Sequence, residues 1–166
     1  IIRPKLYLAN DGNYREMRYF TSWTKIYQLE QYILPPMIQK LTGQKYVPFG
    51  AAILELNDTR IATECCEEMF TPRSPHILYA LNGVEIYCNG SGSHHNLRKL
   101  NKRVELIKGA SARCGGTYLY ANQQGCDGDA TNITTYQSGA KSCEDMPGYH
   151  DIIDREVMVI CNAATD

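Results

Sequence analysis

Segments typical of strands alternate with segments typical of helices along the middle of the chain, and this alternation constrains the fold most. The predicted strands cover residues 60–65, 84–89 and 117–121. A short helix is predicted from Pro75, with Ser74 as its N-cap, to Gly83. A longer helix is predicted from His94 to about Ser111. Its apolar face comprises Leu97, Leu100, Val104 and Ile107. Alternation of this kind indicates an α/β fold.

Weaker strand signals lie outside this region. They cover residues 5–9, 51–56 and 156–163. The turn signal Asn57-Asp58-Thr59 predicts that the segments on either side of it form a hairpin. Residues 26–41 are predicted to be a loop with helical pieces, because a Pro-Pro pair interrupts their apolar pattern.

Composition narrows the class of protein. With 166 residues and a net charge of −1, the chain can form one domain and has no chain-wide basic surface for nucleic acid or membrane. No apolar run approaches the roughly 18 residues that span a bilayer. The seven cysteines are odd in number, so we expect reduced thiols and a cytoplasmic protein, with the three N-glycosylation sequons being chance matches. Because the first residue is Ile, we expect a fragment or a processed product.

The sharpest candidate for chemistry is the run Glu64-Cys65-Cys66-Glu67-Glu68 at the end of a predicted strand. A thiol with a neighbouring base or cation can act as a nucleophile towards a carbonyl group. Adjacent residues of a strand face opposite ways, so one of the two cysteines can face a given pocket. Lys5, in another predicted strand, could stabilise an oxyanion. The alternatives are that the cysteine is a buried core residue and that Lys5 is a solvated surface residue.

Other polar clusters are weaker candidates. Glu16, Glu67 and Glu68 could act as acids or bases, or bind a substrate ammonium group. The small-residue turn 90–93 could bind an anion such as a carboxylate. Adjacent histidines diverge on a helix, so we expect no metal site at His94 and His95. The basic run 98–103 is expected to be a solvated helix face rather than a phosphate site.

Several of these motifs, in this order, resemble the glutamine-hydrolysing domain of the eukaryotic glutamine-dependent NAD synthetases, in the nitrilase superfamily. The matching motifs are Ile2-Arg3-Pro4-Lys5, Val47-Pro48-Phe49-Gly50, Cys66-Glu67-Glu68, Ser91-Gly92-Ser93-His94-His95 and Gly125-Cys126-Asp127-Gly128-Asp129, with residues 9–16, 71–76, 83–86, 97–99 and 120–123. Residues 1–129 are thus family-like, residues 130–150 diverge, and residues 151–166 hold a terminal strand. Residues 1–166 are expected to be a partial domain.

The resemblance implies a nitrilase-like αββα sandwich with a Glu-Lys-Cys triad. It assigns Cys66 as the nucleophile, Lys5 as the triad lysine and Glu16 as a supporting glutamate. It assigns Tyr14, Glu67 and Ser93 to the binding of glutamine, the expected small-molecule partner. The implied reaction is hydrolysis of the glutamine side-chain amide, with the ammonia used to amidate nicotinic acid adenine dinucleotide.

Parts of the family pattern are not matched. The triad glutamate precedes the lysine motif in the family, and the chain begins after that point. The synthetase domain, which uses ATP and Mg, is also outside these residues, and we expect no cofactor and no metal in this domain. Ala51 stands where the family usually has an acidic residue.

Three functions stay open at this level. The first is a piece of a glutamine amidotransferase for NAD synthesis. The second is an inactive nitrilase-like remnant kept as a structural or interaction subunit. The third is another nitrilase-type amidase. In each case we expect a homo-oligomer, or a partner chain, to complete the sandwich, because a partial sandwich leaves sheet edges and core surface exposed.

Overall fold

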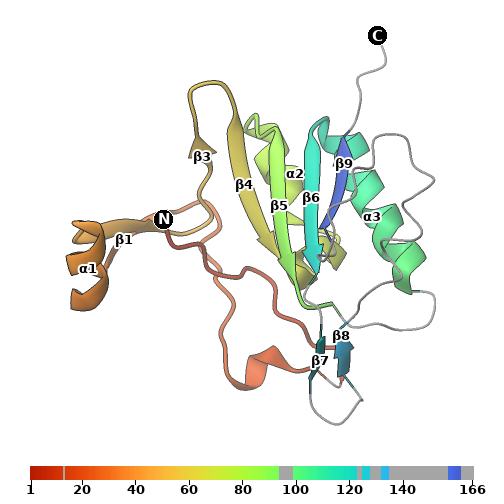
Figure 1. Ribbon diagram of the computed structural model, residues 1–166, viewed down its shortest axis with the longest axis horizontal. Helices are drawn as coiled ribbons and strands as arrows, with labels where there is room; N and C mark the ends of the chain where they lie inside the picture. Colours follow the sequence, from red (N-terminus) through yellow and green to blue (C-terminus); the bar gives the residue numbers. More distant parts are fainter. Residues whose placement is uncertain (13, 94–98, 123–124, 128–131, 135–156, 162–166) are drawn as a thin grey trace. The chain divides into compact units, whose positions relative to one another are not determined.

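The computed structural model describes residues 1–12, 14–93, 99–122, 125–127, 132–134 and 157–161 (Figure 1). The chain divides into two compact units, Ile1–Ile53 and Leu54–Asp166, and each is described by itself. Within the described residues, no helix has both the length and the apolar character needed to cross a membrane.

The first unit is built on a two-stranded antiparallel sheet. Strand β1 (Glu30–Ile33) pairs with β2 (Tyr46–Phe49), and helix α1 (Pro36–Thr42) connects them. The Pro-Pro pair expected to interrupt this segment instead begins the helix, because a proline at the first helical position sacrifices no hydrogen bond. Strand β1 was not predicted, because all four of its residues are exposed and show no apolar alternation.

One strand prediction in this unit was wrong, and a second was right only in part. Residues 5–9 form no strand, and the N–H of Ala9 donates to the carboxylate of Glu16 instead of to a neighbouring strand. The short 3₁₀ helix η1 (Glu16–Arg18) follows directly. The strand predicted at 51–56 is shorter in the structure, where only β3 (Leu54–Glu55) of the second unit forms within it. Residues 47–49, just before it, belong to β2.

The second unit is a five-stranded sheet in the order β3-β4-β5-β6-β9. Its remaining strands are β4 (Arg60–Cys65), β5 (Ile86–Ser91), β6 (Thr117–Asn122) and β9 (Val157–Cys161). Strands β4, β5 and β6 run parallel, and β3 and β9 pair antiparallel at the edges. The predicted α/β alternation and the hairpin before β4 are confirmed. A separate ribbon of β7 (Gly125–Asp127) and β8 (Asn132–Thr134) was not predicted.

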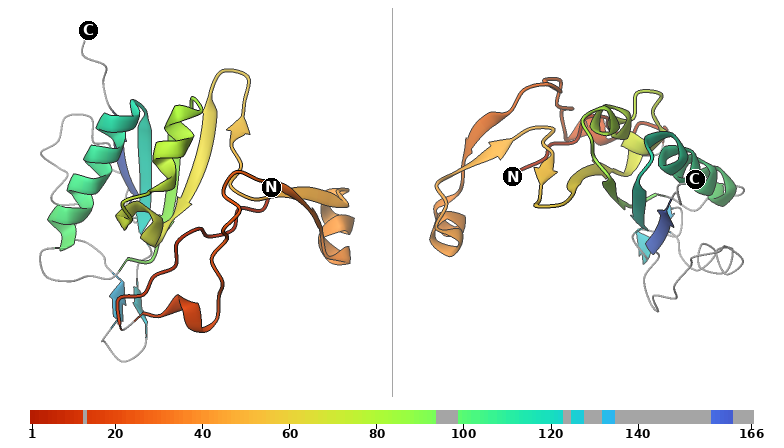
Figure 2. Two further views of the ribbon diagram at one scale, coloured as in Figure 1. Left: turned by 180° about the vertical axis from the view of Figure 1, so that it is seen from behind. Right: turned by 90° about the horizontal axis from the view of Figure 1, so that it is seen from above.

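Helices α2 (Pro75–Leu81) and α3 (Lys99–Cys114) cover the same face of this sheet, as the two opposite views show (Figures 1 and 2). Each follows one parallel strand and leads to the next, as right-handed crossovers require. The buried side chains under the helices alternate along the strands. They are Ala62, Glu64, Tyr87, Asn89, Tyr118 and Tyr120. Ile107 of α3 packs onto this layer with no exposed surface.

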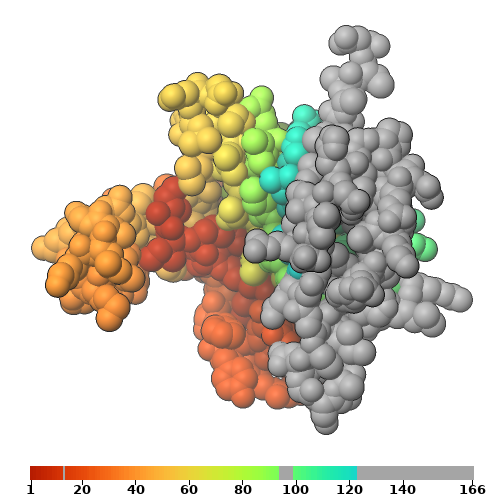
Figure 3. Space-filling model, in the orientation of Figure 1, coloured from red at the N-terminus to blue at the C-terminus, as the bar shows by residue number. Residues whose placement is uncertain are grey.

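No helix among the described residues of this unit covers the other face of the sheet (Figures 1 and 2). Ile86, Cys88 and Leu119 are half-buried there, and atoms of β4, β5 and β6 reach the surface side by side in the space-filling view (Figure 3). One sheet with one helix layer makes half of the expected αββα arrangement. The four cysteines whose side chains are described are all free thiols, namely Cys65, Cys66, Cys88 and Cys114.

Helix α3 corrects one expectation about the basic run 98–103. Arg103 is buried, and its guanidinium lies 5.8 Å from the centre of the Tyr120 ring and donates to the carbonyl of Ser93. The aliphatic stem and the flat guanidinium allow arginine to pack in this way. The expected helix start at His94 and the apolar Leu97 lie outside the described residues.

Two glycines test the packing of this unit. A Cβ added to Gly116 would lie 2.4 Å from the carbonyl oxygen of Glu85 and 3.0 Å from the Tyr87 ring. We therefore expect Gly116→Ala to lower the free energy of unfolding by about 1–3 kcal/mol, as overpacking does. Gly109, in α3, has nothing within 4 Å of its added Cβ. Gly109→Ala should raise that free energy by about 0.5–1 kcal/mol through helix propensity. Denaturant unfolding of both variants measures the difference, and equal midpoints would contradict this packing.

Candidate functional site

Cys66 lies where the chain turns sharply from β4 into the 3₁₀ helix η2 (Cys66–Phe70). Its φ is 46°, and it alone among the described non-glycine residues has a positive φ. A side chain in this region costs of order 1–3 kcal/mol, and such strain concentrates at functional sites. A strained turn between strand and helix is also how α/β hydrolases present their nucleophile. Cys65 is the last residue of β4, so the two cysteines are not on one continuous strand.

Two buried side chains hold the backbone of this turn. The carboxylate of Glu68 accepts the N–H of Cys65 at 2.7 Å, and the side-chain oxygen of Asn89 accepts the N–H of Cys66 at 3.0 Å. Glu68 is fully buried and Asn89 is 2% exposed. The sequence suggested that Glu68 could act as an acid or base. In the structure its carboxylate instead holds the backbone of the turn through the N–H of Cys65.

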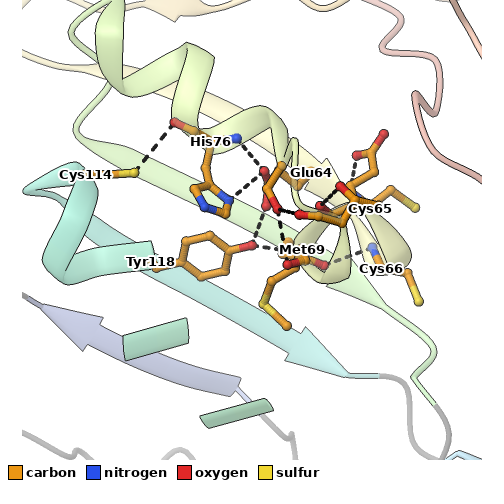
Figure 4. Close-up of polar contacts among 11 residues, drawn as sticks. Glu64, Cys65, Cys66, Met69, His76, Cys114 and Tyr118 are labelled. Carbon is orange, nitrogen blue, oxygen red and sulfur yellow. Dashed lines mark hydrogen bonds and ion pairs between the residues drawn. The ribbon is translucent and has the colours of Figure 1, made fainter. Parts of the chain in front are cut away.

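A buried polar cluster lies beneath the same end of the sheet. Glu64 of β4 accepts hydrogen bonds from the backbone N–H of His76 and from the hydroxyl of Tyr118, and its carboxylate lies 2.9 Å from His76 Nδ1. Figure 4 shows the three side chains converging from β4, α2 and β6. Burial raises the pKa of Tyr118 well above its ordinary value, and the negative charge of Glu64 raises it further. Tyr118 therefore stays protonated and acts as a donor.

This cluster was missed at the sequence level. The residue pattern places Glu64 beside the two cysteines and indicates no site role for His76, Tyr118 or Asn89. The available signal was that Glu64 shares a strand face with Ala62, two residues before it, which is a core position. A carboxylate on a core face needs partners, because an unpaired buried charge is costly.

Ser93 lies just beyond β5, and Asn122 at the end of β6 holds its backbone from both sides. The N–H of Ser93 donates to Asn122 Oδ1 at 2.8 Å, and its carbonyl accepts from Asn122 Nδ2 at 3.1 Å. Ser93 is 4% exposed. Since β4, β5 and β6 are parallel, Cys66 and Ser93 lie at the same edge of the sheet, where open α/β sheets bind ligands.

The other predicted site residues belong to the first unit. Lys5 Nζ lies 2.8 Å and 2.7 Å from the two carboxylate oxygens of Glu16, and both side chains are 17% exposed. Glu16 also accepts the N–H of Ala9 at 2.6 Å. Tyr14 is 43% exposed. Lys5, Glu16 and Tyr14 are thus described within one unit, and Cys66, Glu67 and Ser93 within the other.

A pocket of about 340 Å³ lies in the second unit between η2, α2 and α3. Its lining includes Met69, Phe70, Ser74, His76, Ala110 and Arg113, and it includes none of the predicted site residues. Among the described residues no cluster of three His, Cys, Asp or Glu side chains could hold a metal ion. His94 and His95 lie outside the described residues.

Comparison with known proteins gives consistent matches. The model of the carbon–nitrogen hydrolase family matches residues 1–144. The chain is 67% identical over 128 residues to a glutamine-dependent NAD(+) synthetase of Saccharomyces cerevisiae, covering 77% of the chain. It is 57% identical over 129 residues to the Homo sapiens protein of the same description, covering 78% of the chain. In both cases the chain spans 18% of the relative's length.

Solved structures of similar proteins agree with the match to the carbon–nitrogen hydrolase family. A glutamine-dependent NAD(+) synthetase from Cytophaga hutchinsonii superposes with a TM-score of 0.60 at 29% identity, covering 75% of this chain and 18% of that one. A carbon–nitrogen hydrolase from Helicobacter pylori superposes with a TM-score of 0.50 at 16% identity, covering 78% of this chain and 40% of that one. The second match supports the nitrilase-like fold alone, and the predicted fold class is confirmed.

The buried tyrosines make a testable contribution to alkaline stability. Burial raises the pKa of Tyr120 from 10.0 to about 12, although the charge of Arg103 opposes the shift. A raised pKa means that the neutral form is stabilised, so this contribution is complete below pH 10 and is lost as pH rises towards 12. We expect the free energy of unfolding to fall between pH 8 and pH 11, and to fall less in Tyr120→Phe. Denaturant unfolding at the two pH values measures this, and equal falls in the two proteins would contradict it.

Proposed function

Because the chain belongs to the carbon–nitrogen hydrolase family, we propose that it carries the cysteine nucleophile and the lysine of a glutamine-hydrolysing site. The observation that carries the proposal is the strained conformation of Cys66 at the carboxyl edge of the parallel strands. The description of the relatives as glutamine-dependent NAD(+) synthetases supports glutamine as the substrate.

In the proposed reaction the Cys66 thiolate attacks the carbon of the glutamine side-chain amide. The tetrahedral intermediate expels ammonia, which takes up on leaving the proton that the Cys66 thiol released when the thiolate formed, and a thioester remains on Cys66. Water then attacks the thioester carbon and releases glutamate and the free thiol. The ammonium group of Lys5 stabilises the oxyanion together with a backbone N–H. The N–H of Cys66 is already engaged by Asn89, so the backbone donor is another residue.

Glu16 acts through Lys5 in this proposal. Its carboxylate contacts Lys5 Nζ through both oxygens and also accepts the N–H of Ala9, so it ties the lysine to its own loop. A lysine fixed in this way needs little rearrangement when the oxyanion forms. Tyr14, Glu67 and Ser93 are proposed to bind the glutamine, with the Glu67 carboxylate available for its ammonium group.

The same relatives support a wider proposal. We propose that residues 1–166 are part of a glutaminase domain in a cytoplasmic NAD synthetase. The ammonia then amidates adenylylated nicotinic acid in a synthetase domain outside this chain, where ATP and Mg act. The triad glutamate is proposed to come from polypeptide beyond these residues, and a second copy or a partner chain to complete the sandwich.

A diazoketone analogue of glutamine tests the nucleophile. We expect a single covalent adduct on Cys66, located by peptide mass mapping and prevented by excess glutamine. Cys66→Ala should abolish the adduct, and Cys65→Ala should leave it in place, because Cys65 ends the strand before the strained turn. No adduct, or equal labelling of Cys65 and Cys66, would reject the amidotransferase assignment in favour of an inactive remnant.

Substitution of Glu16 tests the support of the lysine. Glu16→Gln keeps the side-chain shape and removes the charge that holds Lys5, so we expect kcat for glutamine hydrolysis to fall about tenfold or more with little change in KM. Glu30→Gln is the matched control, because Glu30 pairs with Lys25 at the surface, with side chains 46% and 52% exposed. Equal kcat values for the two variants would contradict the proposed support of Lys5 by Glu16.

A further inference from the structure

A chain of hydrogen bonds runs from the backbone of Cys66 across the parallel strands to a buried carboxylate. The N–H of Cys66 donates to Asn89 Oδ1 at 3.0 Å, and Asn89 Nδ2 donates to the Tyr118 hydroxyl at 3.1 Å. That hydroxyl donates in turn to Glu64. We propose that Asn89 is a positioning residue for the nucleophile, and that Tyr118 and Glu64 fix its orientation. This inference rests on the proposed function of Cys66.

The direction of each hydrogen bond follows from counting hydrogens. A tyrosine hydroxyl carries a single hydrogen, and Tyr118 gives it to Glu64, so its oxygen can only accept from Asn89. Asn89 must therefore point its NH₂ group at Tyr118 and its carbonyl oxygen at Cys66. The carboxylate of Glu64 thus determines which end of the Asn89 amide faces the nucleophile.

The surroundings of Asn89 suit a fixed anchor. Glu64 and Asn89 are direct partners in the register of β4 and β5, and Tyr118 belongs to the next strand, β6. Tyr118 has no exposed surface. His76 supports the far side of Glu64 with its backbone N–H and lies with Nδ1 2.9 Å from the same oxygen. The acceptor for Cys66 is therefore built into the core of the sheet rather than onto a loop.

The strain at Cys66 explains why such an anchor is needed. A non-glycine residue at φ 46° persists only where its surroundings hold it there. Glu68 holds the preceding N–H, that of Cys65, and Asn89 holds the N–H of Cys66 itself. Without the second contact the turn can relax, and a thiol displaced by about 1 Å from its productive position can lose up to about 100-fold in rate.

The test is the alkylation of Cys66 by iodoacetamide, followed by peptide mass mapping, with Cys65 of the same molecule as the internal reference. Asn89→Ala removes the acceptor, and we expect the ratio of Cys66 to Cys65 alkylation rates to change about tenfold. Tyr118→Phe leaves the acceptor but frees its orientation, so a smaller change in the same direction is expected. In glutamine hydrolysis both variants should lower kcat with KM preserved.

Ser111→Ala is the matched control. Ser111 is 1% exposed and donates to the carbonyl of the half-buried Gly116 at 2.6 Å, so its loss disturbs an interior side-chain hydrogen bond of the same unit without touching the Cys66 turn. This variant should leave the Cys66 to Cys65 ratio unchanged. Should Asn89→Ala fail to fold, the comparison of Tyr118→Phe with Ser111→Ala decides the question.

The outcomes separate this inference from the proposed function. A ratio that changes in Asn89→Ala or Tyr118→Phe and not in Ser111→Ala supports the positioning role, even if the diazoketone fails to label the unsubstituted protein. Failure of the diazoketone to label the unsubstituted protein would reject the proposed glutamine hydrolysis and would leave the positioning role of Asn89 standing. A ratio equal in all variants overturns the positioning role, whether or not Cys66 reacts with the glutamine analogue.

Discussion

The parallel register of β4, β5 and β6 is the constraint on which the second unit depends. It aligns Glu64 with Asn89 and Asn89 with Tyr120, so polar side chains from three strands lie in one buried row. It also brings the carboxyl ends of the strands, with Cys66 and Ser93, to one edge. Each parallel connection needs a crossover, and α2 and α3 provide these while covering the polar row. The buried polar row, the helix layer over it and the edge that carries Cys66 and Ser93 therefore all depend on this one pattern of strand pairing.

This row of buried polar side chains specifies one arrangement of its neighbours more narrowly than an apolar core does. Tyrosine and asparagine side chains in a buried layer must be matched donor to acceptor, and each match excludes alternative arrangements. The Cys66 N–H completes one such chain, so the geometry of the turn is coupled to the interior. The Lys5–Glu16 pair of the first unit uses a simpler device, a half-buried ion pair reinforced by one backbone N–H.

Residue patterns were sufficient for the elements that local signals define. Strand β4 was predicted with its observed bounds, and α2 begins at Pro75 as expected, because the turn signal before β4 and the N-terminal proline of α2 are local properties. The burial of Arg103 and the absence of a strand at 5–9 depend on contacts with distant residues. Cys66 could be selected from its place at a strand end and from family resemblance. The Glu64–Tyr118–Asn89 chain could not, because it exists only once three strands separated by helices are in register.

The order of these residues along the chain has a consequence for biosynthesis. Cys66 is made first, while Asn89 and Tyr118 follow in later strands, and helix α3 separates those two. Contacts over such sequence separations form late in folding, since the intervening loop entropy must first be paid. The anchor of the strained turn is therefore complete only when β6 has paired with β5, because Tyr118 then fixes the orientation of Asn89. A chain in which β6 has not yet been made lacks the Tyr118 hydroxyl, so full support of the Cys66 turn requires the parallel part of the sheet to be complete.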